Sequence, residues 1–262
     1  MFTDSHCHLT FPELQADWPQ IAQRMQEAQV TRALCICTTL EEFDTVHGFS
    51  VQNAHIWSTV GVHPDYEDIT EPTVDGLVAL SARPKVLGIG ETGLDYYRLN
   101  GRSVAEMEWQ RERFRVHIRA ARQVGKPLII HTRQASEDTL AILREEGEDG
   151  SSGCAGGVFH CFTEDTQVAQ AALDLGFYIS MSGIVTFKNA QVLRDVVCMV
   201  PMDRLLIETD SPYLAPVPYR GKVNTPALVP YVAEQIASLK GLTVEQVAHQ
   251  TSHNFDQLFK PA

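Results

Sequence analysis

Two histidines separated by a single residue, His6 and His8, stand in the segment FTDSHCH at residues 2–8. The segment has the composition of a short strand. Side chains alternate between the two faces of a strand, so His6 and His8 project to one side and Cys7 to the other. Two imidazoles at a strand end can supply half of a divalent metal site. Because a His-x-His pair also occurs in polar loops, a metal site requires further ligands elsewhere.

Further candidate ligands stand where later apolar segments end, at His63, Glu91, His131, His160 and Asp210. Taken alone, each has an ordinary explanation. His63 and Asp210 could be turn residues, Glu91 could cap the next helix, and His160 could lie in the core. Their shared position favours a common functional site over a series of coincidences. The remaining histidines fall in expected helices or loops, and we interpret them as structural: His47, His55, His117, His249 and His253.

The chain around these side chains alternates between expected strands and expected helices. Short apolar segments typical of strands buried on both faces span residues 2–8, 33–37, 56–62, 86–91, 127–130, 158–160, 178–182 and 205–210. Helices are expected at residues 17–30, 41–54, 74–81, 103–124, 136–146, 165–175 and 189–199, with two more after Pro226 and Thr243. Ser103 with Glu106 and Thr243 with Gln246 predict capping boxes. The glycine-rich residues 147–157 predict a mobile loop.

Eight strands, each followed by a helix, predict an α/β fold of the (β/α)₈ TIM-barrel type, with residues 1–262 forming one domain. A doubly wound open sheet is the alternative, and it would place function at a single crevice. Polar residues end six of the expected strands, which suits a closed ring better. In a barrel all strand C-termini meet at one face, so the candidate ligands would converge there.

Composition limits the classes of protein to consider. With 44% hydrophobic residues the chain can bury a large core, and no apolar run reaches the roughly eighteen residues of a membrane span. No basic segment followed by an apolar one indicates a secretory signal. The six cysteines form no C-x-x-C pair, and we expect them to be reduced and the protein to be cytoplasmic. No segment predicts an obligate protein partner.

The formal charge of −12 argues against a general nucleic-acid coat, which would be basic. It does not exclude a phosphate substrate, because bound cations can reverse the local field.

Six blocks in order carry a family resemblance: HCH at 6–8, GVHP at 61–64, GETGLDY at 90–96, HTR at 131–133, HCFT at 160–163 and ETDSP at 208–212. They resemble the motifs of the TatD-type metal-dependent hydrolases, within the amidohydrolase superfamily. The likeness extends to RGKVN at 220–224 and to Asn254 and LF at 258–259, so it covers the whole chain. Glu164, where the family commonly has glycine, and Thr225, where it often has glutamate, are departures that leave substrate preference open.

The resemblance implies a site for two divalent ions. His6, His8 and Asp210 would hold one ion, His131 and His160 the other, and Glu91 would bridge them. Such a pair can share a hydroxide and clamp the oxygens of a phosphodiester. Asp210 would be the catalytic base, with Glu91 the second catalytic residue. Histidine ligands suit zinc, manganese or nickel, and a carboxylate bridge also admits magnesium. Glu208 or Asp4 could orient the imidazoles.

Basic residues near the expected barrel mouth suggest how a phosphate substrate would bind. The candidates are His63, Arg133, Arg98, Arg220 and Lys222. Arg98 follows two tyrosines, which could stack on a base or simply pack the loop. The arginines of residues 111–122 are interleaved with Glu106, Glu108 and Glu112, which indicates a solvated, salt-bridged helix face.

We therefore expect a metal-dependent hydrolase, and the resemblance implies a deoxyribonuclease acting on DNA ends or single-stranded DNA. One alternative is an enzyme of the same superfamily that cleaves a small amide, lactone or phosphoester. The other is a non-catalytic metal-binding barrel, which the intact set of candidate ligands disfavours.

Overall fold

The computed structural model describes residues 1–261, in which eight parallel strands form one sheet in sequence order. The strands are β1 (Phe2–Cys7), β2 (Val30–Cys35), β3 (Ile56–Val60), β4 (Val86–Asp95), β5 (Leu128–Arg133), β6 (Gly157–Phe159), β7 (Tyr178–Met181) and β8 (Leu205–Ile207). Just beyond β8, Ser211 forms a parallel bridge with Cys7 and its carbonyl accepts the N–H of His8 at 2.8 Å. The ring closes, and the predicted TIM barrel is confirmed.

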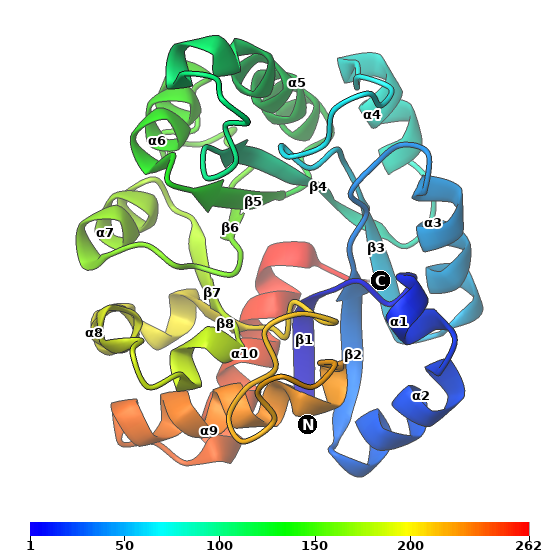
Figure 1. Cartoon of the computed structure of the whole chain (residues 1–262), viewed down its shortest axis with the longest axis vertical. Coiled ribbons are helices and arrows are strands. Elements are labelled where there is room, and N and C mark those ends of the chain that lie inside the picture. Colours follow the sequence, from blue (N-terminus) through cyan, green and yellow to red (C-terminus); the bar gives the residue numbers. More distant parts are fainter. Residues whose placement is uncertain (262) are drawn as a thin grey trace.

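Helices surround the strands on the outside of the ring (Figure 1). They are α1 (Pro12–Gln15), α2 (Trp18–Glu27), α3 (Phe43–Gln52), α4 (Val74–Ser81), α5 (Glu108–Val124), α6 (Ser136–Glu145), α7 (Thr166–Asp174), α8 (Gln191–Met199) and α9 (Val229–Lys240). The last helix, α10 (Val244–Phe259), lies across one end of the barrel. Short 3₁₀ turns are η1 (Val104–Met107), η2 (Gly183–Thr186), η3 (Met202–Arg204) and η4 (Pro226–Leu228). Both predicted capping boxes are present.

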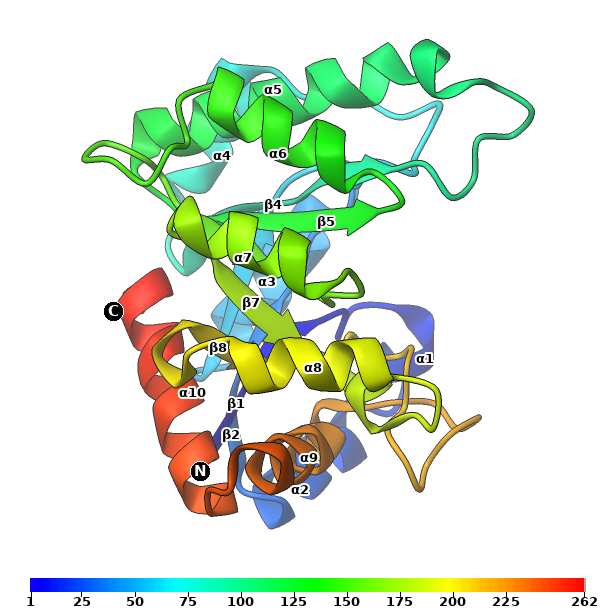
Figure 2. The same ribbon diagram turned by 90° about the vertical axis from the view of Figure 1, so that its left-hand side faces the viewer.

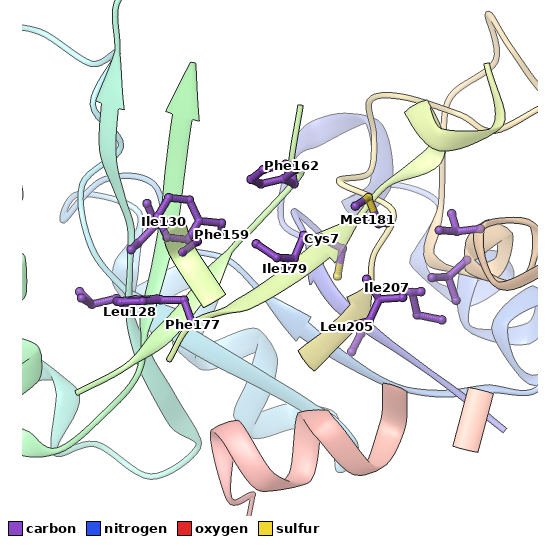
Figure 3. Packing of buried hydrophobic residues seen from close by; sticks show 14 of the residues in the cluster. Cys7, Leu128, Ile130, Phe159, Phe162, Phe177, Ile179, Met181, Leu205 and Ile207 are labelled. Carbon is purple, nitrogen blue, oxygen red and sulfur yellow. The ribbon is translucent and has the colours of Figure 1, made fainter. Parts of the chain in front are cut away.

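Strand residues alternate between the inside of the barrel and the helices. Leu128 and Ile130 belong to the cluster between strands and helices, together with Phe159 and Leu205 (Figure 3). Ile129, one residue away, belongs to a second cluster that fills the barrel. The same period of two continues from Ile129 to His131, from Val158 to His160 and from Leu206 to Glu208. The polar site is therefore the upper layer of the barrel interior.

The lower end of the barrel is closed by α10. Phe255 and Phe259 pack into the interior cluster, and Asn254 donates to the carbonyl of Leu205 at 2.7 Å. In Figure 2, α10 lies at one end of the barrel, and the strand arrowheads point to the other end, where residues 211–225 loop over the rim. The helix that closes the barrel and the candidate functional site are thus at opposite ends of the barrel.

Some predicted boundaries were wrong for local reasons. The helix expected at 17–30 ends at Glu27, because Gln29 adopts a left-handed conformation (φ 57°) and Val30 pairs with Phe2 as the start of β2. Asp17 does not cap this helix with its side chain. It pairs instead with Arg24 at 2.8 Å.

The bounds of five strands also differ from expectation by two residues or more: β2, β3, β4, β5 and β8. β2 lies at 30–35 rather than 33–37, and β8 ends at Ile207, three residues before Asp210, which adopts a left-handed conformation (φ 56°). β4 continues to Asp95 because it pairs with β5 as far as Arg133.

All six cysteines are free thiols. Among residues 1–261, no helix has both the length and the apolar character that crossing a lipid bilayer requires.

Candidate metal centre

The carboxylate of Glu91 lies at the centre of the site, surrounded by imidazoles from four other strands. Glu91 is 3% exposed. Oε1 of Glu91 lies 2.8 Å from Nε2 of His160, 3.3 Å from Nε2 of His63 and 3.4 Å from Nδ1 of His131. Oε2 lies 3.4 Å from Nε2 of His6 and 3.9 Å from Nε2 of His8. Residues from positions 6 to 160 thus meet around one carboxyl group.

The ends of β1 and β8 bring a second carboxylate to the same place. Oδ1 of Asp210 lies 3.4 Å from Nε2 of His8 and 3.6 Å from Nε2 of His6, and these two nitrogens are 3.3 Å apart. The N–H of Asp210 donates to the carbonyl of His6 at 3.0 Å, which fixes one strand end against the other. The alternation expected for His6 and His8 is therefore confirmed.

Two buried carboxylates orient the histidines of β5 and β6 from behind. Asp95 Oδ2 lies 3.0 Å from Nε2 of His131, and Glu208 Oε1 lies 3.3 Å from Nδ1 of His160. A neutral imidazole that donates its one N–H to such a carboxylate keeps a lone pair on its other nitrogen. That other nitrogen faces Glu91 in both residues. This arrangement is typical of histidines that bind metals.

His63 has the opposite arrangement. The backbone N–H of Asp65 donates to Nδ1 of His63 at 3.1 Å, so a neutral ring carries its hydrogen on Nε2. Burial lowers the pKa of His63 and favours the neutral ring. Nε2–H then points at Glu91 and the cavity as a donor. His63 therefore suits a hydrogen bond to a substrate oxygen better than a bond to a metal.

The charges of the centre fit a divalent cation. Four largely buried carboxylates meet here, and within residues 1–261 none has a lysine or arginine nitrogen within 4.0 Å: Glu91, Asp95, Glu208 and Asp210. Buried charges require a paired charge or a metal. Burial raises the pKa of Glu91, but the facing histidine charges outweigh it and hold this pKa well below its usual range. Burial lowers the pKa of His160, but the Glu91 carboxylate holds it well above its usual range.

Three groups of side chains have ligand atoms close enough to hold one ion each. Within each group the atoms lie within 4.8 Å of one another: His6, His8 and Glu91; His63, Glu91 and His131; and His6, His160 and Glu208. Nδ1 of His6 and Nδ1 of His8 are buried without a hydrogen-bond partner among the described residues. The nitrogen and oxygen donors match the preferences of zinc, manganese and nickel.

Asp4 supports the backbone rather than an imidazole. Its carboxylate accepts from the N–H of His6 at 3.2 Å and from the N–H and hydroxyl of Thr209 at 2.9 and 2.6 Å. Burial raises the pKa of Asp4 to about 8. Of the two residues expected to orient imidazoles, only Glu208 does so directly.

A cavity of about 610 Å³ opens above the centre. Of the predicted substrate residues, His63, Arg98 and Arg133 line it, together with Phe11 and Tyr213, which the sequence did not single out. The Arg133 guanidinium lies 3.6 Å over the ring of Tyr97, and Arg98 lies 3.5 Å from Asp65.

The other two predicted substrate residues lie outside this cavity. Arg220 lines an adjoining cavity, and Lys222 is exposed and lines neither. The ion pairs expected on α5 are present, with Arg111 2.6 Å from Glu108 and Arg119 3.2 Å from Glu112, but Arg113 is buried and not solvated as expected.

Sequence reasoning missed Asp95. The signal was present, because residues 91, 93 and 95 share one face once β4 continues past Glu91. Gly93, between them, has φ 125°, and a Cβ there would lie 1.9 Å from the carbonyl oxygen of His131. Only glycine fits at this close approach of β4 and β5.

Comparisons with known proteins agree with this geometry. Residues 3–260 match the model of the family described as TatD related DNase. The chain is 47% identical over 260 residues to an uncharacterized metal-dependent hydrolase, YcfH, of Escherichia coli K12, covering 98% of this chain and 94% of that protein. It is 32% identical over 262 residues to the 3′-5′ ssDNA/RNA exonuclease TatD of Citrobacter rodentium, covering 98% and 97%. The crystal structure of YjjV, a TatD homologue from Escherichia coli K12, superposes with a TM-score of 0.88 at 25% identity, covering 99% and 98%. The chain therefore belongs to the TatD family of metal-dependent hydrolases.

Proposed function

We propose that this hydrolase cleaves phosphodiester bonds at the ends of single-stranded nucleic acid, with DNA as the expected substrate. The observation that carries the proposal is the ring of imidazole nitrogens around the Glu91 carboxylate, at 2.8–3.9 Å. Cations beside this ring, on Arg98 and Arg133, suit a phosphate. The relative named as a 3′-5′ ssDNA/RNA exonuclease supports the same class of substrate.

Two divalent ions are proposed as cofactors. His6, His8 and Asp210 would hold one ion, and His131 and His160 the other, with Glu91 between them. Magnesium, manganese, zinc and nickel are the candidates. When bound, such ions supply a hydroxide at neutral pH and stabilise charge on the phosphate oxygens.

The chain's own side chains have separable tasks in this proposal. Burial raises the pKa of Asp210, but the contacts with His8 and His6 outweigh it and keep this carboxyl ionised. Asp210 faces the cavity and can accept a proton from the attacking water. The Nε2–H of His63 and the guanidinium of Arg133 can donate to a non-bridging phosphate oxygen.

The test combines metal reconstitution with a substrate panel. Protein stripped with chelator and reloaded with each candidate ion is assayed on single-stranded DNA, RNA, a lactone, an amide and a simple phosphodiester. We expect metal-dependent release of mononucleotides from single strands and about two ions per chain by elemental analysis. Hydrolysis of only the small substrates would replace the nuclease proposal with the small-molecule alternative.

The variant Asp210→Asn tests the proposed base. Loss of a general base reduces kcat by about 10²- to 10⁴-fold. Asp195→Asn is the matched control, because Asp195 lies on α8 and contacts Gln191 at 2.8 Å. An Asp210→Asn protein that retains metal and cleaves as fast as the parent would exclude this role. If neither parent nor variant hydrolyses any substrate, the non-catalytic barrel is the better description.

The free thiols support the cytoplasmic location that we propose for the enzyme.

A further inference from the structure

A second cavity adjoins the one above the metal centre. It has a volume of about 350 Å³ and shares Thr163 and Ile184 with the larger cavity. We call it the side groove, lined by Thr163, Ile184, Phe187, Lys188, Asn189, Ala190, Val192, Leu193 and Arg220. The two loops that form it are joined, because the N–H of Val217 donates to Oγ1 of Thr186 at 2.9 Å. The side groove is thus a built continuation of the substrate cavity.

The cations of the side groove are not neutralised by the protein. Within residues 1–261, neither Lys188 nor Arg220 has a carboxylate oxygen within 4.0 Å, although the chain carries a net charge of −12. The guanidinium of Arg220 lies 3.8 Å over the ring of Phe187, which holds it at the groove while its N–H groups stay available. Two cations without a carboxylate partner, one of them held in place by Phe187, can bind an anion from solution.

The opposite side of the mouth differs in charge. There the loop after β3 carries acids that are already paired with arginines: Asp65 with Arg98, Glu67 with Arg102 and Glu71 with Arg113. A polyanion that leaves the centre on that side would meet arginines whose charge is already shared with a carboxylate, including Arg98 of the substrate cavity. The side groove is therefore the electrostatically favourable direction for a nucleic-acid strand to leave the centre.

Resting on the proposed function, we propose that the side groove binds a phosphodiester next to the one at the metal centre, so that a single strand extends over Phe187. Lys188 and Arg220 contact the phosphate, and the apolar floor of Ile184 and Phe187 packs against the neighbouring base or sugar. Proteins that bind single strands combine these two features, a basic groove and an aromatic surface. The groove would make the enzyme prefer oligonucleotides to isolated diesters.

Binding of a fluorescein-labelled hexathymidylate, measured by anisotropy with metal-loaded protein, tests this directly. All proteins carry Asp210→Asn to slow cleavage, and a gel confirms that the strand is intact. Adding Lys188→Ala or Arg220→Ala should weaken binding about five- to tenfold. Each should also lower the slope of log Kd against log salt by about 0.7, the value for one lost contact to a single-stranded phosphate. Arg144→Ala is the control, because Arg144 is an exposed cation in the last turn of α6, at the other end of the barrel.

A catalytic comparison separates the groove from the reaction itself. With Asp210 intact, kcat/KM is measured for the hexamer and for thymidine 5′-(p-nitrophenyl) phosphate, which has a single diester. Groove variants should reduce the ratio of hexamer to single-diester activity about fivefold or more. Absence of any diester hydrolysis would overturn the proposed function, while the anisotropy result would still decide the groove. Groove variants that match Arg144→Ala in Kd and salt slope, or a parent that does not bind the hexamer, would overturn the groove.

Discussion

At the scale of single residues, the position of one hydrogen atom separates the roles of neighbouring histidines. When their rings are neutral, His131 and His160 each donate an N–H to the carboxylate behind them, so the second nitrogen presents a lone pair to the centre. His63 accepts a backbone N–H, so its second nitrogen presents a hydrogen. All three appear alike in the sequence, where each simply follows an apolar segment. Their expected roles as ligands and as a substrate contact become distinguishable only through these partners.

Asp95 should tune metal binding without reacting itself. Replacing Asp95 with Asn keeps the shape but removes the charge that holds the hydrogen of His131 on Nε2. Loss of such a partner weakens metal affinity by about 10- to 100-fold. Competition titration of stripped protein with a metal-binding dye measures this affinity. The Tm of the stripped variant should match that of the parent within about 2 °C, and Asp195→Asn should leave the affinity unchanged. Unaltered metal affinity in Asp95→Asn would contradict the positioning role.

The candidate ligands were more predictable from the sequence than the carboxylates that position them. His6, His8 and the later strand-end residues were found because strand alternation and barrel topology place such residues at one rim. Asp95 was missed because β4 was expected to end at Glu91, so Asp95 was not recognised as a strand residue on the same face as Glu91. The tasks of Asp4 and Glu208 could not be separated, because both are acids on strands and only the fold shows which backbone or ring each one meets.

At the scale of elements, a buried histidine joins α5 to the end of β3. Nε2 of His117 accepts the N–H of Val62 at 2.9 Å, and Nδ1–H donates to the carbonyl of Arg113 at 2.7 Å. The same helix sends the guanidinium of Arg113 to the carbonyls of His63 and Tyr66, at 3.0 and 2.8 Å. α5 therefore positions the loop that carries His63. The sequence analysis interpreted His117 as structural, and these contacts agree.

This contact predicts a pH dependence of stability. Burial lowers the pKa of His117 to about 4, from 6.5. Below about pH 6.5 the unfolded chain binds a proton that the folded protein excludes until about pH 4, so stability falls as pH decreases through this window. The contribution between pH 7.5 and 5.0 is about 2 kcal/mol.

Urea unfolding of stripped protein at the two pH values measures this loss. Other groups also titrate, so the comparison is with His117→Gln, in which the loss should be smaller by about 2 kcal/mol. Equal pH dependence in parent and variant would show that His117 is protonated in the folded protein or does not contribute.

Element boundaries show where sequence patterns are insufficient. Capping boxes and the end of the long helix at Val124 were predicted, because they depend on residues close in sequence. The loop at 147–157 was expected to be mobile from its glycines. In the structure the buried carboxylate of Glu148 accepts from the N–H groups of Ala155 and Gly156 at 3.0 and 2.9 Å and pairs with Arg122 at 2.9 Å. A single long-range ion pair organises the loop, and no local pattern shows it.

At the scale of the whole molecule, stability and chemistry are placed at opposite ends of the barrel. α10 lies at the end of the barrel where the strands begin (Figure 2), and the candidate metal centre lies where they end. The barrel itself was predictable, because eight alternating units have few ways to close. The position of α10 across the end of the barrel was not predictable, because its amphipathic pattern resembles that of the outer helices.

Phe259→Ala tests this division. Phe259 is 4% exposed, and the centroid of its ring lies 4.8 Å from that of Phe255. Its removal should cost about 3–5 kcal/mol, which lowers the Tm by about 10 °C in a chain of this size. The kcat of the folded variant should remain within about twofold of the parent. Gln257→Ala, an exposed change on the same helix, is the control for both measurements. A large fall in kcat at a temperature where the variant is fully folded would show that the two ends are coupled.

The backbone hydrogen bond from the N–H of Asp210 to the carbonyl of His6 connects the segment after the last strand to the first strand. Because the ribosome makes the first strand long before the last, His6 and His8 must wait for about two hundred further residues before Asp210 arrives. A nascent or prematurely terminated chain therefore lacks part of its reactive centre, however well its earlier strands have folded. Under the role proposed for Asp210, unfinished copies of the chain would have no hydrolytic activity.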